Sequence, residues 1–105
     1  MIKNYTLAAA TTDVCTSAAA QKLALFNMMF YNTSASAVTL EVHLVPKGVT
    51  KSAATQVAYW EVPPKDWAEW TSDAKLMLED GDKVAVVAGT GAVINAFVNY
   101  MVVPL

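Results

Sequence analysis

The chain has 105 residues, of which 55% are apolar and only 15% are charged, and its formal net charge is −2. This length fits one domain and leaves no room for a second core. The seven basic residues are all lysines, spread singly along the chain, which argues against the clustered basic surface that a nucleic acid or an anionic membrane would need.

The apolar fraction exceeds, and the charged fraction falls below, the averages of about 45–50% and 25% for soluble domains. The longest apolar run, residues 84–105, is interrupted by glycine, asparagine and proline, so it does not supply the roughly 20 consecutive apolar residues of a membrane helix. The surplus therefore predicts that neighbouring protein subunits cover part of the surface. The first residues lack the apolar run of a secretion signal, so we expect cytoplasmic synthesis.

The first 20 residues, rich in alanine and threonine, are expected to form either an arm that lies on a neighbour or a first strand, and residues 21–105 to form a single β-sandwich domain. Residues 16–25 offer a helical alternative, because good helix formers follow Thr16 and Ser17, either of which could cap a helix. Cys15 is the single cysteine, so an internal disulfide is excluded.

Two strands are predicted next. Residues 23–31 are apolar at almost every position, which is typical of a strand covered on both faces. Residues 38–45 alternate, with apolar side chains on one face and Thr39, Glu41 and His43 on the other. The turn-forming residues at 32–36 predict that these two strands form a β-hairpin.

The second half of the chain continues the pattern. Strands are expected at residues 56–62, 67–71, 74–78, 83–88 and 92–103, with a stop at Pro63-Pro64 and a turn at residues 79–82. Seven or eight short strands with turn signals every 8–12 residues are typical of an all-β fold, either an antiparallel β-sandwich or a jelly roll.

The inventory of reactive side chains argues against an enzyme. His43 is the only histidine, and its place on the polar face beside Glu41 predicts a solvent-facing strand residue. No nucleophile motif accompanies it, and Cys15 is expected to be a small, half-buried side chain. The acidic residues at 79–82 suit an Asp-Gly turn better than a calcium loop. We therefore expect no catalytic residue, cofactor or metal site.

Trp60, Trp67 and Trp70 are the main aromatic cluster. Some of them must be core, but the charges beside Trp67 and Trp70 suggest that these two are exposed. Exposed tryptophans serve either as a contact with another protein or as a stacking platform for a sugar. A glycan-binding or adhesive module is therefore the second functional hypothesis.

Both faces of the strands at 23–31 and 92–103 are apolar, although a two-layer sandwich covers only one face of each sheet. The remaining faces are predicted to be protein contacts, and a homo-oligomer is expected. The expected interface residues, taken with the tryptophans above, are Trp67, Trp70, Met28, Phe97 and Met101.

Three stretches give the chain a resemblance to the small β-sandwich virion proteins of tailed bacteriophages. Residues 13–40, with the Asn32-Thr33-Ser34 turn, resemble the opening strands of those proteins. Residues 76–84 resemble their hairpin of leucine, acidic residue, Gly-Asp, lysine and aliphatic residue, and residues 92–103 are similar to their closing strand. Residues 63–67 depart from the pattern, because such proteins carry a plain proline-glycine turn there.

The resemblance implies a structural protein of a bacteriophage virion, synthesised in the host cytoplasm, that decorates or cements the capsid by binding its subunits. A subunit of the neck or tail is the alternative within the same class.

Overall fold

The structure is a computed structural model that describes residues 1–104, with the side chains of residues 72–75 and 104 outside the description. Over this range the chain forms eight strands and one short 3-10 helix, η1 (Ala53–Thr55). The strands are β1 (Ile2–Thr6), β2 (Thr11–Thr16), β3 (Gln21–Asn32), β4 (Val38–Val45), β5 (Gln56–Val62), β6 (Trp67–Leu78), β7 (Lys83–Ala88) and β8 (Ile94–Pro104). Within residues 1–104 no helix has the length and apolar character that a membrane crossing requires.

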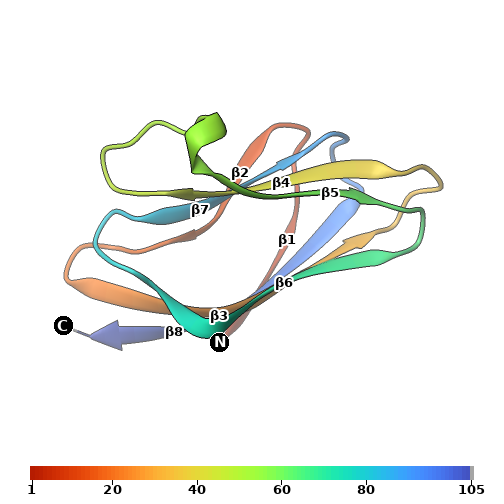
Figure 1. The fold of residues 1–105 in the computed structure, drawn as a ribbon. Coiled ribbons are helices and arrows are strands. Elements are labelled where there is room, and N and C mark those ends of the chain that lie inside the picture. The colour runs from red at the N-terminus through yellow and green to blue at the C-terminus, as the bar shows by residue number, and fades with distance from the viewer. Residues whose placement is uncertain (105) are drawn as a thin grey trace.

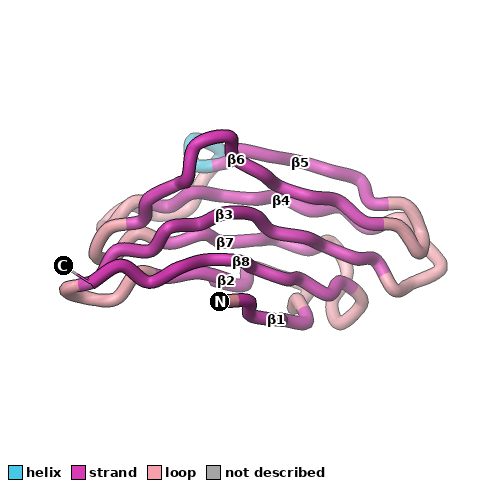
Figure 2. The backbone as a smooth tube through the Cα atoms, turned by 90° about the horizontal axis from the view of Figure 1, so that it is seen from below, coloured by secondary structure: helices cyan, strands magenta, loops and turns pink. Residues whose placement is uncertain are grey.

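The strands form two antiparallel sheets of four strands that pack face to face (Figure 1). Sheet A has the order β1-β8-β3-β6, and sheet B has the order β2-β7-β4-β5. The chain crosses from one sheet to the other at every connection in residues 1–104 except the one between β4 and β5. Figure 2, seen from below, shows the strands of both sheets running along the same general direction. This strand order is that of a jelly roll, so the predicted all-β sandwich is confirmed.

The core lies between the sheets and is built from alternate residues of the strands. Its largest fully buried side chains are Leu7, Leu25, Met28, Phe30, Leu40 and Ile94. Burial of such a side chain contributes about 1.5–3 kcal/mol. In β4 the inward positions are Val38, Leu40 and Val42, as the alternation predicts.

A β-bulge in β3 changes which of its side chains point inward. Leu25 pairs with Tyr100 and Asn27 with Asn99, so Phe26 is an extra residue on this strand. An extra residue shifts the alternation by one, and Met28 therefore joins Leu25 on the inner face with no exposed surface. The prediction that Met28 points outward is wrong for this reason.

The connection between β3 and β4 is a corner between the sheets, so the predicted hairpin is wrong. The buried amide of Asn32 stabilises this corner. Its Nδ2 donates to the carbonyls of Ser36, Val62 and Pro63 at 2.8, 3.1 and 3.3 Å. Its Oδ1 accepts from the backbone N and the Oγ of Ser34 at 2.9 and 2.7 Å. One side chain thus replaces the hydrogen bonds that a tight turn would make.

The acidic turn at residues 79–82 also connects the two sheets. Gly81 has a φ of 85°, the left-handed conformation expected for the Asp-Gly sequence. Asp82 accepts from the backbone N of Lys47 at 2.9 Å and from that of Glu79 at 3.0 Å, and Asp80 pairs with the Lys47 ammonium at 3.3 Å. These carboxylates hold the loop after β4 in place, and the described residues include no cluster of three or more potential metal ligands.

The first 20 residues belong to the sandwich. β1 pairs with β8 and β2 pairs with β7, and β3 is extended from Gln21 onward. The helical alternative for residues 16–25 is therefore wrong. The strands expected at 67–71 and 74–78 are one continuous strand, β6, on the edge of sheet A.

Candidate protein interface

The outer face of sheet A carries most of the large apolar side chains that are exposed. Beyond the row of Met101 the pairing register continues this face with Lys22 and Val103, and the exposed apolar side chains lie in four rows. The rows are Thr6, Asn95, Tyr31 and Trp67; Asn4, Phe97, Met29 and Glu69; Ile2, Asn99, Asn27 and Thr71; and Met101, Ala24 and Met77. We call these fifteen positions the apolar face.

Seven large side chains of the apolar face are between 37% and 69% exposed, and they are Ile2, Met29, Tyr31, Trp67, Met77, Phe97 and Met101. Near the centre of the face is a hollow of about 130 Å³, lined by Ile2, Asn27, Met29, Phe97 and Asn99. An exposed apolar area of this kind is uncommon on a monomer and usually marks an interface.

The four rows of the apolar face carry one charged residue, and Lys22 borders them, paired with Glu79 at 3.5 Å. Glu69 is the one charged residue among the fifteen positions, and its carboxylate accepts a hydrogen bond from Asn27 at 3.2 Å. The other polar side chains of the face are asparagines and threonines. Covering this surface with another protein would therefore bury little charge, which is the costly step in forming an interface.

The outer face of sheet B is different, because it carries Asp13, Glu41, Glu61 and Lys83. Asp13 and Lys83 form an ion pair at 3.3 Å. The two outer faces of the sandwich are therefore not equivalent, because that of sheet B is charged and that of sheet A is apolar. The apolar surplus of the sequence is concentrated on sheet A.

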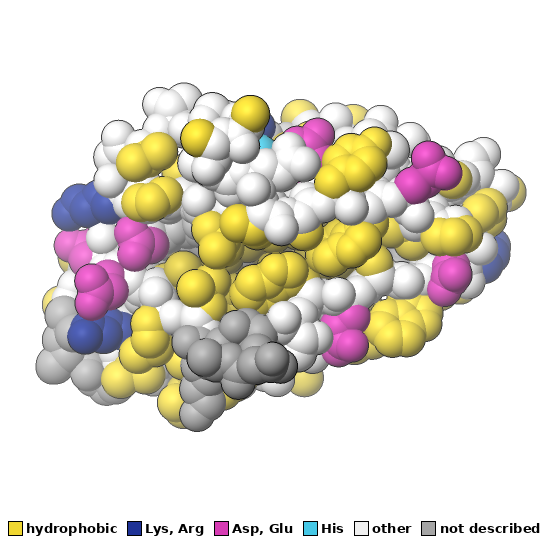
Figure 3. All heavy atoms as spheres, in the orientation of Figure 1, with side chains coloured by type: hydrophobic (Ala, Val, Ile, Leu, Met, Phe, Trp, Pro, Cys, Tyr) yellow, Lys and Arg dark blue, Asp and Glu magenta, His cyan; other side chains and the backbone are white. Residues whose placement is uncertain are grey.

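A second apolar surface lies along the edge where β5 and β6 approach each other. Figure 3 shows apolar side chains gathered between the two sheets on this side. Trp60 and Trp70 lie here, partly buried against the core, and the rings of Trp60 and Phe30 are 6.0 Å apart. Both tryptophans therefore pack against their own domain and leave only part of their surface exposed.

Trp67 and Trp70 project from opposite faces of β6. Trp67 pairs with Tyr31 on the outer face and is 53% exposed, whereas Trp70 pairs with Met28 and packs inward. Residues three apart on a strand point to opposite sides. The predicted sugar platform built from these two tryptophans is therefore wrong, and Trp70 is a core-packing residue at the edge.

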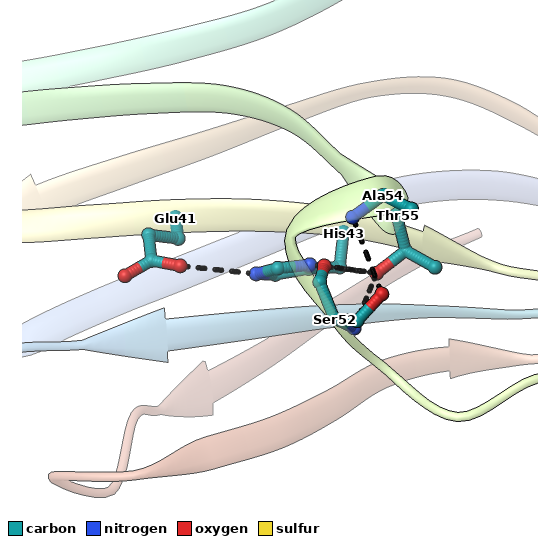
Figure 4. A network of polar contacts seen from close by, with 5 residues as sticks. All are labelled: Glu41, His43, Ser52, Ala54 and Thr55. Carbon is teal, nitrogen blue, oxygen red and sulfur yellow. Dashed lines mark hydrogen bonds and ion pairs between the residues drawn. The ribbon is translucent and has the colours of Figure 1, made fainter.

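His43 is buried, so the prediction that it faces solvent is wrong. It does lie on the outer side of sheet B, but the segment that ends in η1 folds over it (Figure 4). Its Nδ1 lies 2.9 Å from Thr55 Oγ1, and its Nε2 lies 3.1 Å from Glu41 Oε1. Ser52 and Thr55 cap η1 through a capping box. The imidazole therefore holds a surface loop in place.

Cys15 is the other residue considered for nucleophilic chemistry. Burial raises the pKa of its thiol to about 11, and the nearby Lys3 offsets this only in part. A thiol that stays protonated at neutral pH is a poor nucleophile. Neither Cys15 nor His43 is placed for covalent catalysis.

The structure places three of the five expected interface residues, Trp67, Phe97 and Met101, on the apolar face. Met28 and Trp70 point inward instead. The alternation of β8 was enough to place Phe97 and Met101. Ile2 and Met77 were missed, because their exposure depends on which strands are neighbours in sheet A.

No protein-family model matches this chain, and no curated protein sequence matches it. Solved structures do match its fold. A chain of the Bacillus endospore appendages, which are described as a family of disulfide-linked pili, superposes with a TM-score of 0.60 at 17% identity, over 100% of this chain and 84% of its own length. A chain of the nora virus structure has a TM-score of 0.54 at 7% identity, over 99% of this chain and 55% of its own length.

The crystal structure of PirA is a third match, with a TM-score of 0.53 at 13% identity, over 95% of this chain and 93% of PirA. At these identities the likeness is one of fold. The jelly roll of this chain is thus shared with proteins of a pilus and of a virus.

Proposed function

We propose that this chain is a structural subunit of a protein assembly of the virion or appendage type, and that it acts by binding neighbouring subunits rather than by catalysis. The apolar face is the observation that carries the proposal. A surface whose four rows carry seven exposed large apolar side chains and one charged residue is typical of a contact with another protein. The matches to a pilus chain and a virus chain support the same class.

Within this class, we propose that the chain decorates or cements the capsid of a bacteriophage and resides in the virion after synthesis in the host cytoplasm. A subunit that binds only the assembled shell stabilises that shell by mass action. A place in the neck or tail is the alternative within this class, and it differs in the neighbouring subunit.

The contacts of this chain are proposed to be non-covalent. One cysteine per chain can join at most two chains, and Cys15 is buried with a protonated thiol. The apolar face must therefore supply the cohesion. This separates the chain from the pilus proteins described as disulfide-linked.

The proposal is tested by density-gradient fractionation of the cells that produce the protein. We expect the chain to sediment with particles, and a Phe97→Glu variant to move to the unassembled fraction while its β circular dichroism signal is kept. Purified particles that carry the wild-type chain should fail at a higher temperature than particles without it. Recovery of the wild-type chain only in the unassembled fraction would overturn the proposal, and equal failure temperatures would remove the cementing role.

A further inference from the structure

We infer that the apolar face is a homodimer interface, in which a second copy of this chain packs face to face about a two-fold axis. The axis lies in the plane of the interface, above the line between β3 and β8 and parallel to these strands. This inference rests on the proposed function and names the occupant of its contact surface. It is carried by the size of the apolar face, by its lack of charge and by the arrangement of its rows.

The exposed apolar area matches what a stable dimer needs. The seven large side chains are on average about half exposed. At roughly 200 Å² for a fully exposed side chain of this size, they present about 700 Å². A specific interface of standard size buries about 800 Å² per partner. A second copy could therefore form a complete interface from these side chains and the asparagines between them.

The central rows are nearly symmetric about the line between β8 and β3. Phe97 pairs with Met29 across that line, Asn99 pairs with Asn27, and Met101 pairs with Ala24. An axis along this line places each of these residues against its own row partner from the second copy. In these three rows apolar groups face apolar groups, and amides face amides, which can exchange hydrogen bonds. In the remaining central row the Asn95 amide faces the Tyr31 ring.

The same axis also gives the Glu69 carboxylate a polar partner. Asn4 and Glu69 occupy the two ends of the row that contains Phe97 and Met29. Rotation by the two-fold axis brings the Asn4 amide of one copy to the Glu69 carboxylate of the other. The two carboxylates lie at opposite edges of the interface, so like charges are not brought together.

The shape of the face suits this packing. The hollow lined by Ile2, Met29 and Phe97 lies beside the axis and has room for an apolar side chain from the facing sheet. Two sheets that pack face to face interdigitate their side chains across a layer about 10 Å thick. A pair of sandwiches joined in this way would be a four-layer unit with the charged sheet B on both outer surfaces.

The inference is tested by light scattering and sedimentation of the isolated chain over a range of concentrations. We expect a reversible monomer–dimer equilibrium. Phe97→Glu changes two sites in each dimer. If each change weakens the affinity tenfold, the dissociation constant rises about 100-fold. Met101→Glu tests another row of the same face in case the first variant unfolds. The matched control is Tyr59→Glu, on the outer face of sheet B and 57% exposed, which should leave the constant unchanged.

A charge-pair experiment tests the axis itself. Phe97→Lys and Met29→Glu chains should each dimerise weakly, but an equal mixture should form heterodimers, because the axis places the two new charges against each other. No recovery in the mixture would overturn the proposed axis. A wild-type chain that is monomeric at every concentration would overturn the homodimer, and if Phe97→Glu still removed that chain from particles, the proposed function would stand with a different partner on the same face.

Discussion

Replacement of Asn32 tests how the two sheets are held together at their corner. Asn32→Ala removes a buried side chain with five hydrogen bonds. The Val62 carbonyl loses a donor in a buried setting, which costs about 1–3 kcal/mol, and the bonds to Ser34 and Ser36 add about 0.5–1.5 kcal/mol each. These terms add up to between about 2.5 and 7.5 kcal/mol, and we expect the free energy of unfolding to fall by about 4 kcal/mol, in the lower half of that range.

Asn32→Asp tests the loss of the donor without the loss of side-chain volume. It keeps the size and the acceptor oxygen, but it places a carboxylate against the three carbonyls that now accept from Nδ2. We expect a loss of stability at least as large as that of Asn32→Ala. Urea denaturation at a fixed, low protein concentration is the assay, and Gln56→Glu, the same amide-to-acid change at an exposed position, is the control that should stay within about 0.5 kcal/mol. If Asn32→Asp remained within 1 kcal/mol of the wild type, the corner would not depend on this amide.

Three further predictions concern other parts of the chain. In the same assay, Gly81→Ala should lower the free energy of unfolding by about 2 kcal/mol and Gly48→Ala by about 1 kcal/mol. Both glycines have a positive φ, but only at Gly81 would the new Cβ lie 2.6 Å from a carbon of the Lys47 side chain. Equal losses of stability would contradict the contact with Lys47. His43→Ala should speed amide exchange in η1 while leaving the exchange of β8 unchanged, since the imidazole contact to Thr55 holds that loop; unchanged exchange at Ala54 and Thr55 would count against it. Cys15 should react with a thiol reagent at neutral pH about 100-fold more slowly in the native than in the urea-unfolded chain, and rapid native labelling would show that the thiol is accessible.

Alternation along the strands was sufficient to predict the fold class and part of the candidate interface. In β4 the alternation identifies the inner side chains Val38, Leu40 and Val42, and in β8 the expected outward residues Phe97 and Met101 are exposed. In β3 the same method fails at Phe26, because apolar residues on both sides of the bulge leave no trace of the shift in the sequence. Met28 was assigned to the wrong face for that reason, and Met29 takes its place on the apolar face.

The remaining errors have a common physical cause, which is that turn chemistry is local while sheet membership is not. The turn residues after Asn32 and around Gly81 were recognised, but both turns connect different sheets. The burial of His43 depends on a loop that folds back over sheet B. Such contacts between distant segments are fixed by packing, and a pattern within ten residues does not contain them.

The central claim is that the outer face of sheet A is the contact surface of this subunit, and hydroxyl-radical footprinting tests it most directly. Met29, Phe97 and Met101 on the apolar face and Tyr59 on sheet B are all at least 40% exposed in the single chain, so all four should be oxidised when the chain is dilute. In the assembled particle, oxidation of Met29, Phe97 and Met101 should fall sharply relative to that of Tyr59. Protection of Tyr59 with undiminished oxidation of the other three would contradict the claim and place the contact on sheet B.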